Sequence, residues 1–105
     1  MQPSTCAAAK GTIKKDPAII EAAVCEYLGI TVDHMKDKKR RSLQVRARQI
    51  AIYLMYHRFT MSLSAIGRRF GRDHTTIMYN LRTMDNYLST EESMRQDVRN
   101  VEKMI

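Results

Sequence analysis

Several residue types are scarce in this chain of 105 residues, and each scarcity excludes a class of protein. Tryptophan is absent and aromatic residues make up 7% of the chain, so the sequence does not favour a surface that stacks single-stranded RNA or DNA bases on aromatic rings. The two cysteines, Cys6 and Cys25, are far apart and follow no signal peptide, which predicts a reduced, cytoplasmic protein. The longest uninterrupted apolar run covers only residues 50–55, so no membrane-spanning helix is expected.

Motifs for catalysis and for metal or cofactor binding are also lacking. There is no GxxxxGK[ST] phosphate-binding loop, no CxxC pair, and the three histidines lie far apart in the sequence. Asp73 and His74 are neighbours, but on a helix adjacent side chains diverge by about 100°, so they do not form a catalytic dyad. We therefore expect no catalytic residue, no metal site, no cofactor and no nucleotide-binding domain.

Positive charge is abundant, and it is concentrated in the middle of the chain. The net charge is +7, yet residues 36–82 alone carry twelve Lys and Arg against two acids, Asp37 and Asp73. The flanking segments are slightly acidic. This distribution predicts a polyanionic partner for the central part of the chain.

The apolar residues recur at helical spacing, which predicts an all-α fold with one domain over residues 15–105. Residues 1–14 have no apolar period and are expected to form a flexible tail. Asp16 and Pro17 are typical of a helix start and Gly29 of a helix end, so we expect a helix over 17–28. Thr31 is expected to cap a short helix with Val32 and Met35 facing the core.

A basic loop and a long helix should follow. Residues 36–42, KDKKRRS, have no apolar anchor and are predicted to form an exposed basic loop, which is either a simple solvated segment or a nucleic-acid contact. A helix is expected over 43–57, with Ala47, Ile50, Ala51 and Leu54 facing inward.

The next two helices have the layout of a helix-turn-helix, a motif whose second helix enters the major groove of DNA. Ser62 is expected to cap a helix over 63–70 that ends at Gly71, and Asp73 to begin a second helix over 73–88. Gly67 costs about 1 kcal/mol inside a helix, which is explained either by close approach of the partner helix or by an unremarkable surface position. Ser89 and Glu92 match a capping box for a last helix. The expected inward residues of these segments are Phe70, Ile77, Leu81, Met84, Leu88, Met94, Val98, Val101 and Ile105.

The polar group Asp73-His74-Thr75-Thr76 begins the second helix of this motif. Ordinary capping by Asp73 is a purely structural explanation, but it leaves the other three residues unexplained. On a recognition helix the four residues can contact base edges. There the Asp73 carboxylate can accept a hydrogen bond from cytosine, and a threonine methyl can pack on the thymine methyl. An arginine-rich loop can enter the adjacent minor groove. Arg46, Arg48 and Gln49 are then candidates to bind phosphates.

The runs ARQIAIYL (47–54) and SLSAIGRRFGRDHTTIMYNLR (62–82) resemble the C-terminal DNA-binding domain of the bacterial replication initiator DnaA, a small helical domain with a Trp-repressor-like helix-turn-helix. The resemblance implies double-stranded DNA as the partner, with a short asymmetric A·T-rich box bound by a monomer. It places Arg40, in the basic loop beside Arg41, in the minor groove. It places Asp73, His74 and Thr75 on bases, with Leu63 and Ser64 approaching them, and Arg48, Gln49, Arg72 and Thr76 on the DNA backbone.

This sequence also departs from that family's pattern. Ser64 and Ala65 replace the common Pro-Glu pair, Arg68 and Arg69 make the first helix of the motif more cationic, and residues 56–59 differ from the usual polar type, which puts phosphate contacts there in doubt. Residues 1–35 do not supply the ATPase domain that precedes this domain in full-length initiators. The chain is therefore expected to be a fragment or a free-standing relative that acts in replication control or transcription regulation and meets replication proteins. The alternative is an adaptor that docks acidic protein partners through its basic face.

Overall fold

The structure is a computed structural model that describes residues 16–37 and 42–105. These residues form six α-helices and no strand: α1 (Pro17–Leu28), α2 (Val32–Lys36), α3 (Ser42–His57), α4 (Leu63–Phe70), α5 (His74–Thr90) and α6 (Glu92–Glu102). The predicted all-α class is confirmed for this part of the chain. The expected tail over residues 1–14, Cys6, and the loop residues Arg40 and Arg41 lie outside the described residues.

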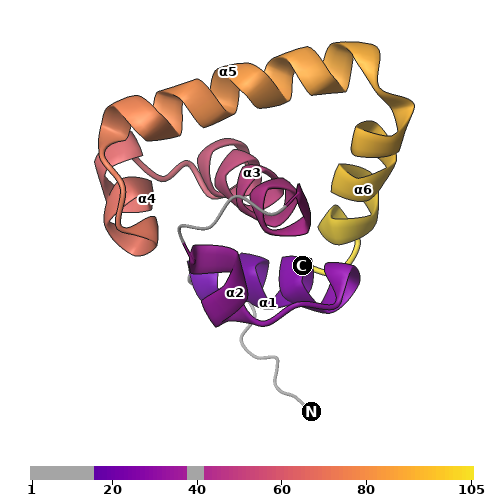
Figure 1. Cartoon of the computed structure of the whole chain (residues 1–105), viewed down its shortest axis with the longest axis horizontal. Helices are drawn as coiled ribbons and strands as arrows, with labels where there is room; N and C mark the ends of the chain where they lie inside the picture. The colour runs from indigo at the N-terminus through magenta and orange to yellow at the C-terminus, as the bar shows by residue number, and fades with distance from the viewer. Residues whose placement is uncertain (1–15, 38–41) are drawn as a thin grey trace, which may run out of the picture.

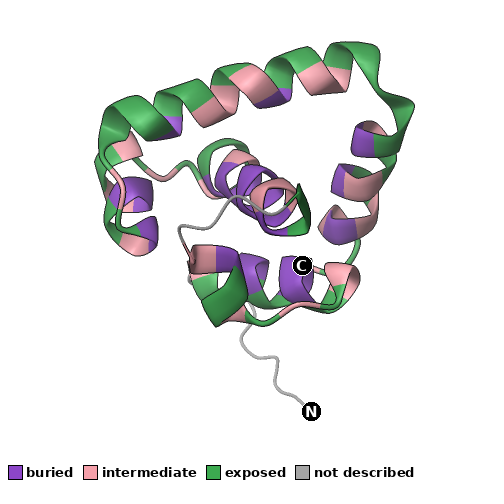
Figure 2. Cartoon of the chain, viewed as in Figure 1, coloured by how far each residue is buried: buried purple, intermediate pink, exposed green. Residues whose placement is uncertain are grey.

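The helices are arranged around α3 (Figure 1). The long α5 passes across one side of α3, with α4 at its N-terminal end and α6 at its C-terminal end, and α1 and α2 lie on the opposite side. The buried residues face the space around α3, and the outer face of α5 is exposed along its length (Figure 2). Accordingly, α3 contributes the largest share of the core, including Ile50, Ile52 and Leu54, which are fully buried.

Local signals in the sequence explain where most helices begin and end. Asp16 accepts a hydrogen bond from the Ala18 backbone N–H at 3.0 Å, and Thr31 accepts one from the His34 backbone N–H at 3.1 Å. Gly29 closes α1 with φ of 73°, in the left-handed region that a residue without a Cβ adopts most easily. The predicted starts of α1 and α2 and the predicted end of α1 are therefore confirmed.

The predicted inner faces are also confirmed, with some residues at the edge of the core. Four of the eight methionines are buried in the core, as expected for flexible gap-filling side chains: Met35, Met55, Met84 and Met94. Among the other expected core residues, Phe70, Ile77, Val98 and Val101 are buried, and Leu81, Leu88 and Ile105 pack against the core while partly exposed.

Two boundary predictions are wrong. The basic loop was predicted over residues 36–42, but Lys36 is the last residue of α2 and Ser42 the first of α3, while residues 38–41 lie outside the described residues. The capping box of Ser89 and Glu92 does not form: α5 continues to Thr90, and the Ser89 hydroxyl donates to the Asp85 carbonyl at 2.9 Å. Glu91 instead occupies the N-cap of α6 without a side-chain hydrogen bond.

Candidate nucleic-acid interface

The helix-turn-helix consists of α4, a turn at residues 71–73, and α5. The Ser62 hydroxyl accepts from the Ala65 backbone N–H at 3.1 Å, and α4 ends at Gly71, which has φ of 65°. Asp73 then caps α5 by accepting from the Thr76 backbone N–H at 2.9 Å. Each of these positions is the one that the sequence predicted, since capping and left-handed turns depend on residues close together in the chain.

Gly67 is required by the geometry of this turn. A Cβ built on Gly67 would overlap the backbone carbonyl oxygen of Arg72, which lies against the middle of α4. The Arg72 N–H also donates to the Gly67 carbonyl at 2.9 Å. Gly67 is therefore a close-approach position, as one of the two sequence interpretations held, although its neighbour is the turn backbone rather than the body of the partner helix.

The N-terminal turn of α5 presents its polar side chains to solvent. Asp73, His74, Thr75 and Thr76 are all exposed, and the inward face of α5 begins only at the fully buried Ile77. Hydrogen bonding by Thr76 lowers the pKa of the Asp73 carboxyl below its ordinary value, so Asp73 is a carboxylate at neutral pH. Capping fully explains the position of Asp73, while the exposure of the next three residues leaves them available to a ligand.

A shallow hollow beside this turn brings α4 and α5 together, and we call it the turn hollow. Its lining residues are Ser64, Gly67, Arg68, Gly71, Arg72, Asp73 and His74. Arg68 is exposed, whereas Leu63, at the start of α4, is half-buried and packs against the core. Of the predicted base-contacting residues, the structure thus places Ser64, Asp73 and His74 around one concavity, with Thr75 exposed next to it.

A second hollow lies between α3 and α5, and we call it the α3–α5 hollow. It includes the four residues that the family resemblance assigned to the DNA backbone: Arg48, Gln49, Arg72 and Thr76. Arg72 belongs to both hollows, so the two form a continuous surface around the start of α5. Burial lowers the pKa of the Arg72 guanidinium, and this group donates to the Phe70 carbonyl at 2.6 Å.

The same hollow includes residues that the sequence analysis did not select. Tyr79, Asn80 and Thr83 line it, and Tyr79 is 69% exposed. They follow Thr76 at three, four and seven residues, which is the spacing of one helix face. The sequence could therefore have identified them as the residues that share a helix face with Thr76 further along the chain.

Two of the predicted phosphate-binding residues have contacts inside the fold. Arg48 is 7% exposed and its guanidinium donates to the Met35 and Asp37 carbonyls, at 3.0 and 2.6 Å. Gln49 is buried to the same extent. Arg48 therefore holds the end of α2, and a phosphate contact at either residue stays a prediction.

Arg46 points to a different part of the molecule. Its guanidinium forms an ion pair with Asp97 of α6 at 2.6 Å, and Asp97 also accepts from the Tyr27 hydroxyl at 2.8 Å. This network joins α3, α6 and α1. Arg46 lines neither of the two hollows described above, so its predicted phosphate contact competes with a structural role.

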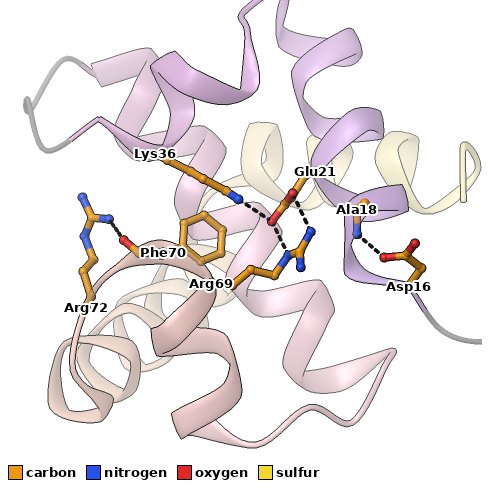
Figure 3. A network of polar contacts seen from close by, with 7 residues as sticks. All are labelled: Asp16, Ala18, Glu21, Lys36, Arg69, Phe70 and Arg72. Carbon is orange, nitrogen blue, oxygen red and sulfur yellow. Dashed lines mark hydrogen bonds and ion pairs between the residues drawn. The ribbon is translucent and has the colours of Figure 1, made fainter.

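Of the two arginines that give α4 its extra positive charge, Arg68 and Arg69, only one is free of contacts with the described residues that would keep it from a DNA partner. Arg68 is exposed, but Arg69 donates two hydrogen bonds to the buried Glu21 carboxylate, at 2.6 and 3.1 Å (Figure 3). One of the two cations that distinguish this helix is thus neutralised inside the protein.

Other kinds of site receive no support from the described residues. Residues 16–37 and 42–105 contain no group of three or more His, Cys, Asp or Glu side chains that could hold a metal ion. Over the same ranges, none of the helices has both the length and the apolar character that a membrane crossing requires.

Comparison with known proteins identifies the family. The model of the bacterial DnaA helix-turn-helix matches residues 17–84, which include α1 to α4 and the first part of α5. The chromosomal replication initiator protein DnaA of Caldanaerobacter subterraneus subsp. tengcongensis is 32% identical over 87 residues, covering 83% of this chain and 20% of that protein. The proteins of the same name from Zymomonas mobilis and Streptococcus pyogenes serotype M1 are 37% and 36% identical over 81 and 87 residues. These two matches cover 76% and 82% of this chain, and 17% and 19% of the respective relatives.

The chain spans about a fifth of the length of these relatives. The part that the family model matches, residues 17–84, includes every residue of both hollows except Tyr87. The capped α4, the left-handed Gly71 and the exposed start of α5 are the parts of a helix-turn-helix, a DNA-binding motif. By its sequence and by this arrangement, the chain belongs to the bacterial DnaA helix-turn-helix family.

Proposed function

We propose that this chain binds double-stranded DNA at a preferred sequence similar to a DnaA box. In this proposal the start of α5 enters the major groove, where His74, Thr75 and Asp73 contact base edges. Leu63 and Ser64 approach the same groove from α4. The observation that carries the proposal is the exposed turn at residues 73–76, bordered by the turn hollow and the α3–α5 hollow.

The DNA backbone is bound on the side of the α3–α5 hollow. Gln49, Arg72 and Thr76 lie around it, so one phosphate strand can run along it. Arg48 lines the hollow as well, and it contributes positive charge there while it holds α2. Arg46 is a weaker candidate because of its ion pair with Asp97.

The basic segment of residues 38–41 supplies the second groove contact in this proposal. In the sequence it follows Asp37, the C-cap of α2, and precedes Ser42, the first residue of α3, and it contains Arg40 and Arg41. An arginine-rich segment next to a helix-turn-helix can enter the adjacent minor groove, where A·T-rich DNA is narrow and strongly negative. Together the two contacts define a short asymmetric site that one molecule can occupy.

The relatives are named as chromosomal replication initiators, so we place the role of this chain in the control of DNA replication or of transcription, inside the cell and in contact with replication proteins. Binding, rather than catalysis, is the proposed activity. Nothing among the described residues favours the alternative of a protein adaptor that docks through the basic face.

The experiment is selection of bound duplexes from a random pool, followed by titration of the selected duplex and a scrambled one at the same salt concentration. We expect one short, non-palindromic sequence and an affinity well above that for the scrambled duplex. Equal affinity for the two duplexes would refute specific binding. A palindromic site would refute the assignment to a single bound molecule.

A further inference from the structure

One exposed arginine beside the start of α5 has no part in the function proposed above. Arg68, in the last turn of α4, is exposed and forms no ion pair or hydrogen bond with the described residues. Its neighbour Arg69 donates two hydrogen bonds to the Glu21 carboxylate. Of the two arginines of α4, Arg68 is therefore the one whose guanidinium is available to a partner.

Arg68 lines the turn hollow, where several of the other lining residues are small. Ser64 lies four residues before Arg68, so the two side chains share one face of α4. Gly71 ends α4, and a Cβ built on it would meet no atom within 4 Å, which indicates open space on that side of the turn. A sugar-phosphate chain can therefore approach the backbone of α4 closely at this point.

The charges of the turn hollow favour an anion against α4. Arg68 and Arg72 contribute two cations, and Asp73 contributes one carboxylate. That carboxylate accepts from the Thr76 N–H at 2.9 Å, so it is directed at the first turn of α5. The Arg72 guanidinium donates to the Phe70 carbonyl at 2.6 Å, which leaves Arg68 as the cation of this hollow without a partner in the described part of the fold.

The turn hollow and the α3–α5 hollow flank the start of α5 with different elements. The first is lined by α4 and the turn, the second by α3 and the body of α5, and they share Gly71 and Arg72. An α-helix with its side chains is about 10–12 Å across, close to the width of the major groove, about 12 Å. A helix that fills the groove therefore brings the surfaces beside it close to the phosphates of both strands. In helix-turn-helix proteins the first helix crosses the DNA backbone, and here that helix is α4.

We propose that Arg68 binds a DNA phosphate in the turn hollow, so that the DNA backbone is held on the α4 side of the recognition helix as well as on the α3 side. The inference rests on the proposed function and adds to it a contact that seats α5 between the two strands. Because a phosphate carries no sequence information, Arg68 contributes affinity and orientation and leaves base preference unchanged.

The first test is titration of the selected duplex with the full chain at several salt concentrations. Each neutralised phosphate adds about 0.9 to the steepness of log K against log salt. For Arg68→Gln the steepness should fall by about 0.9, so that between 50 and 200 mM salt this variant loses about threefold to fourfold less affinity than the wild type. Arg68→Lys keeps the charge and should keep the slope.

Arg99→Gln is the matched control for the loss of one positive charge. Arg99 is an exposed arginine of α6, which lies at the other end of α5 (Figure 1), and it lines neither hollow. This variant should keep the slope of the wild type. Urea unfolding of Arg68→Gln should give the wild-type midpoint, because Arg68 has no contact to lose within the described fold. A lowered midpoint would show that Arg68 stabilises the protein and would overturn its assignment as a free cation.

The second test locates the phosphate by ethylation interference, in which a phosphate neutralised by an ethyl group no longer supports binding where the protein contacts it. The wild-type protein should show sensitive phosphates on both strands across one major groove. Arg68→Gln should lose sensitivity on one strand and keep every sensitive phosphate on the other. Loss on both strands, or no loss at all, would overturn the proposal.

Two further results would count against Arg68. An unchanged salt slope for Arg68→Gln excludes the phosphate contact, and a changed base preference would make Arg68 a reader of base edges instead. The outcome is separable from the proposed function. If the wild-type protein does not discriminate between the selected and scrambled duplexes, the proposed function fails. If it discriminates while Arg68→Gln keeps the wild-type slope and interference pattern, only the contact of Arg68 fails.

Discussion

Replacing Gly67 with alanine sets two physical effects against each other. In an ordinary helix interior this change stabilises a protein by about 1 kcal/mol, because alanine restricts the unfolded chain and favours the helix. Here the new Cβ would overlap the Arg72 carbonyl oxygen, which is a backbone atom of the turn and cannot rotate away. Inserting a methyl group into packed structure costs about 1–3 kcal/mol. The overlap can be relieved only if the turn itself moves, so we expect the cost to lie near the upper end of this range. After the gain from alanine is subtracted, the free energy of unfolding should fall by about 1–2 kcal/mol.

Urea and thermal unfolding of Gly67→Ala measure this loss, and each kcal/mol corresponds to about 4–8 °C in a domain of this size. Gly29→Ala is a suitable control. It forces an alanine into the left-handed region at a cost of about 1–2 kcal/mol, but no atom lies within 4 Å of the added Cβ, and Gly29 lines neither of the two hollows. Both variants should lose stability, and only Gly67→Ala should also lose DNA discrimination, since it displaces the start of α5. A Gly67→Ala protein as stable as the wild type would show that Arg72 does not approach α4 as the structure has it.

Other substitutions and conditions test the remaining assignments. Thr75→Ala should relax base preference by about 1–3 kcal/mol in duplex titrations, while Tyr79→Phe, which keeps the ring, should not. Arg48→Ala should weaken all duplexes about equally and also lower the urea midpoint, because two carbonyls at the end of α2 lose their donor; unchanged stability would contradict its contacts with Met35 and Asp37. With about six to eight phosphates neutralised, affinity should fall by ~10³-fold or more between 50 and 200 mM salt, and a flat titration would exclude phosphate binding. The lowered pKa of Asp73 predicts a contribution to stability that is present above pH 3.8 and lost as the pH falls further, so Asp73→Asn should reduce the acid sensitivity of unfolding.

The helices and their limits were largely predictable because their signals are local. Asp16, Ser62 and Asp73 each cap a helix within three residues of their own position, and Gly71 ends α4 through its own backbone conformation. The exception at Ser89 has the same local character. Two local alternatives existed there, and the Ser89 hydroxyl donates to the Asp85 carbonyl within a longer α5 instead of capping α6.

The amino-acid sequence by itself determined the all-α class, the helix-turn-helix and the polar exposed start of α5, because helical period, capping and turn residues act over a few neighbouring positions. Only the tertiary structure decided which basic residues remain available to a partner. Arg46, Arg48 and Arg69 are the same residue type and cannot be told apart by composition. In the structure Arg46 binds Asp97, 51 residues away, and Arg69 binds Glu21, 48 residues away. Arg48 binds the carbonyls of Met35 and Asp37, 13 and 11 residues away. Such contacts depend on how the helices pack, and a charge count along the chain contains no information about them.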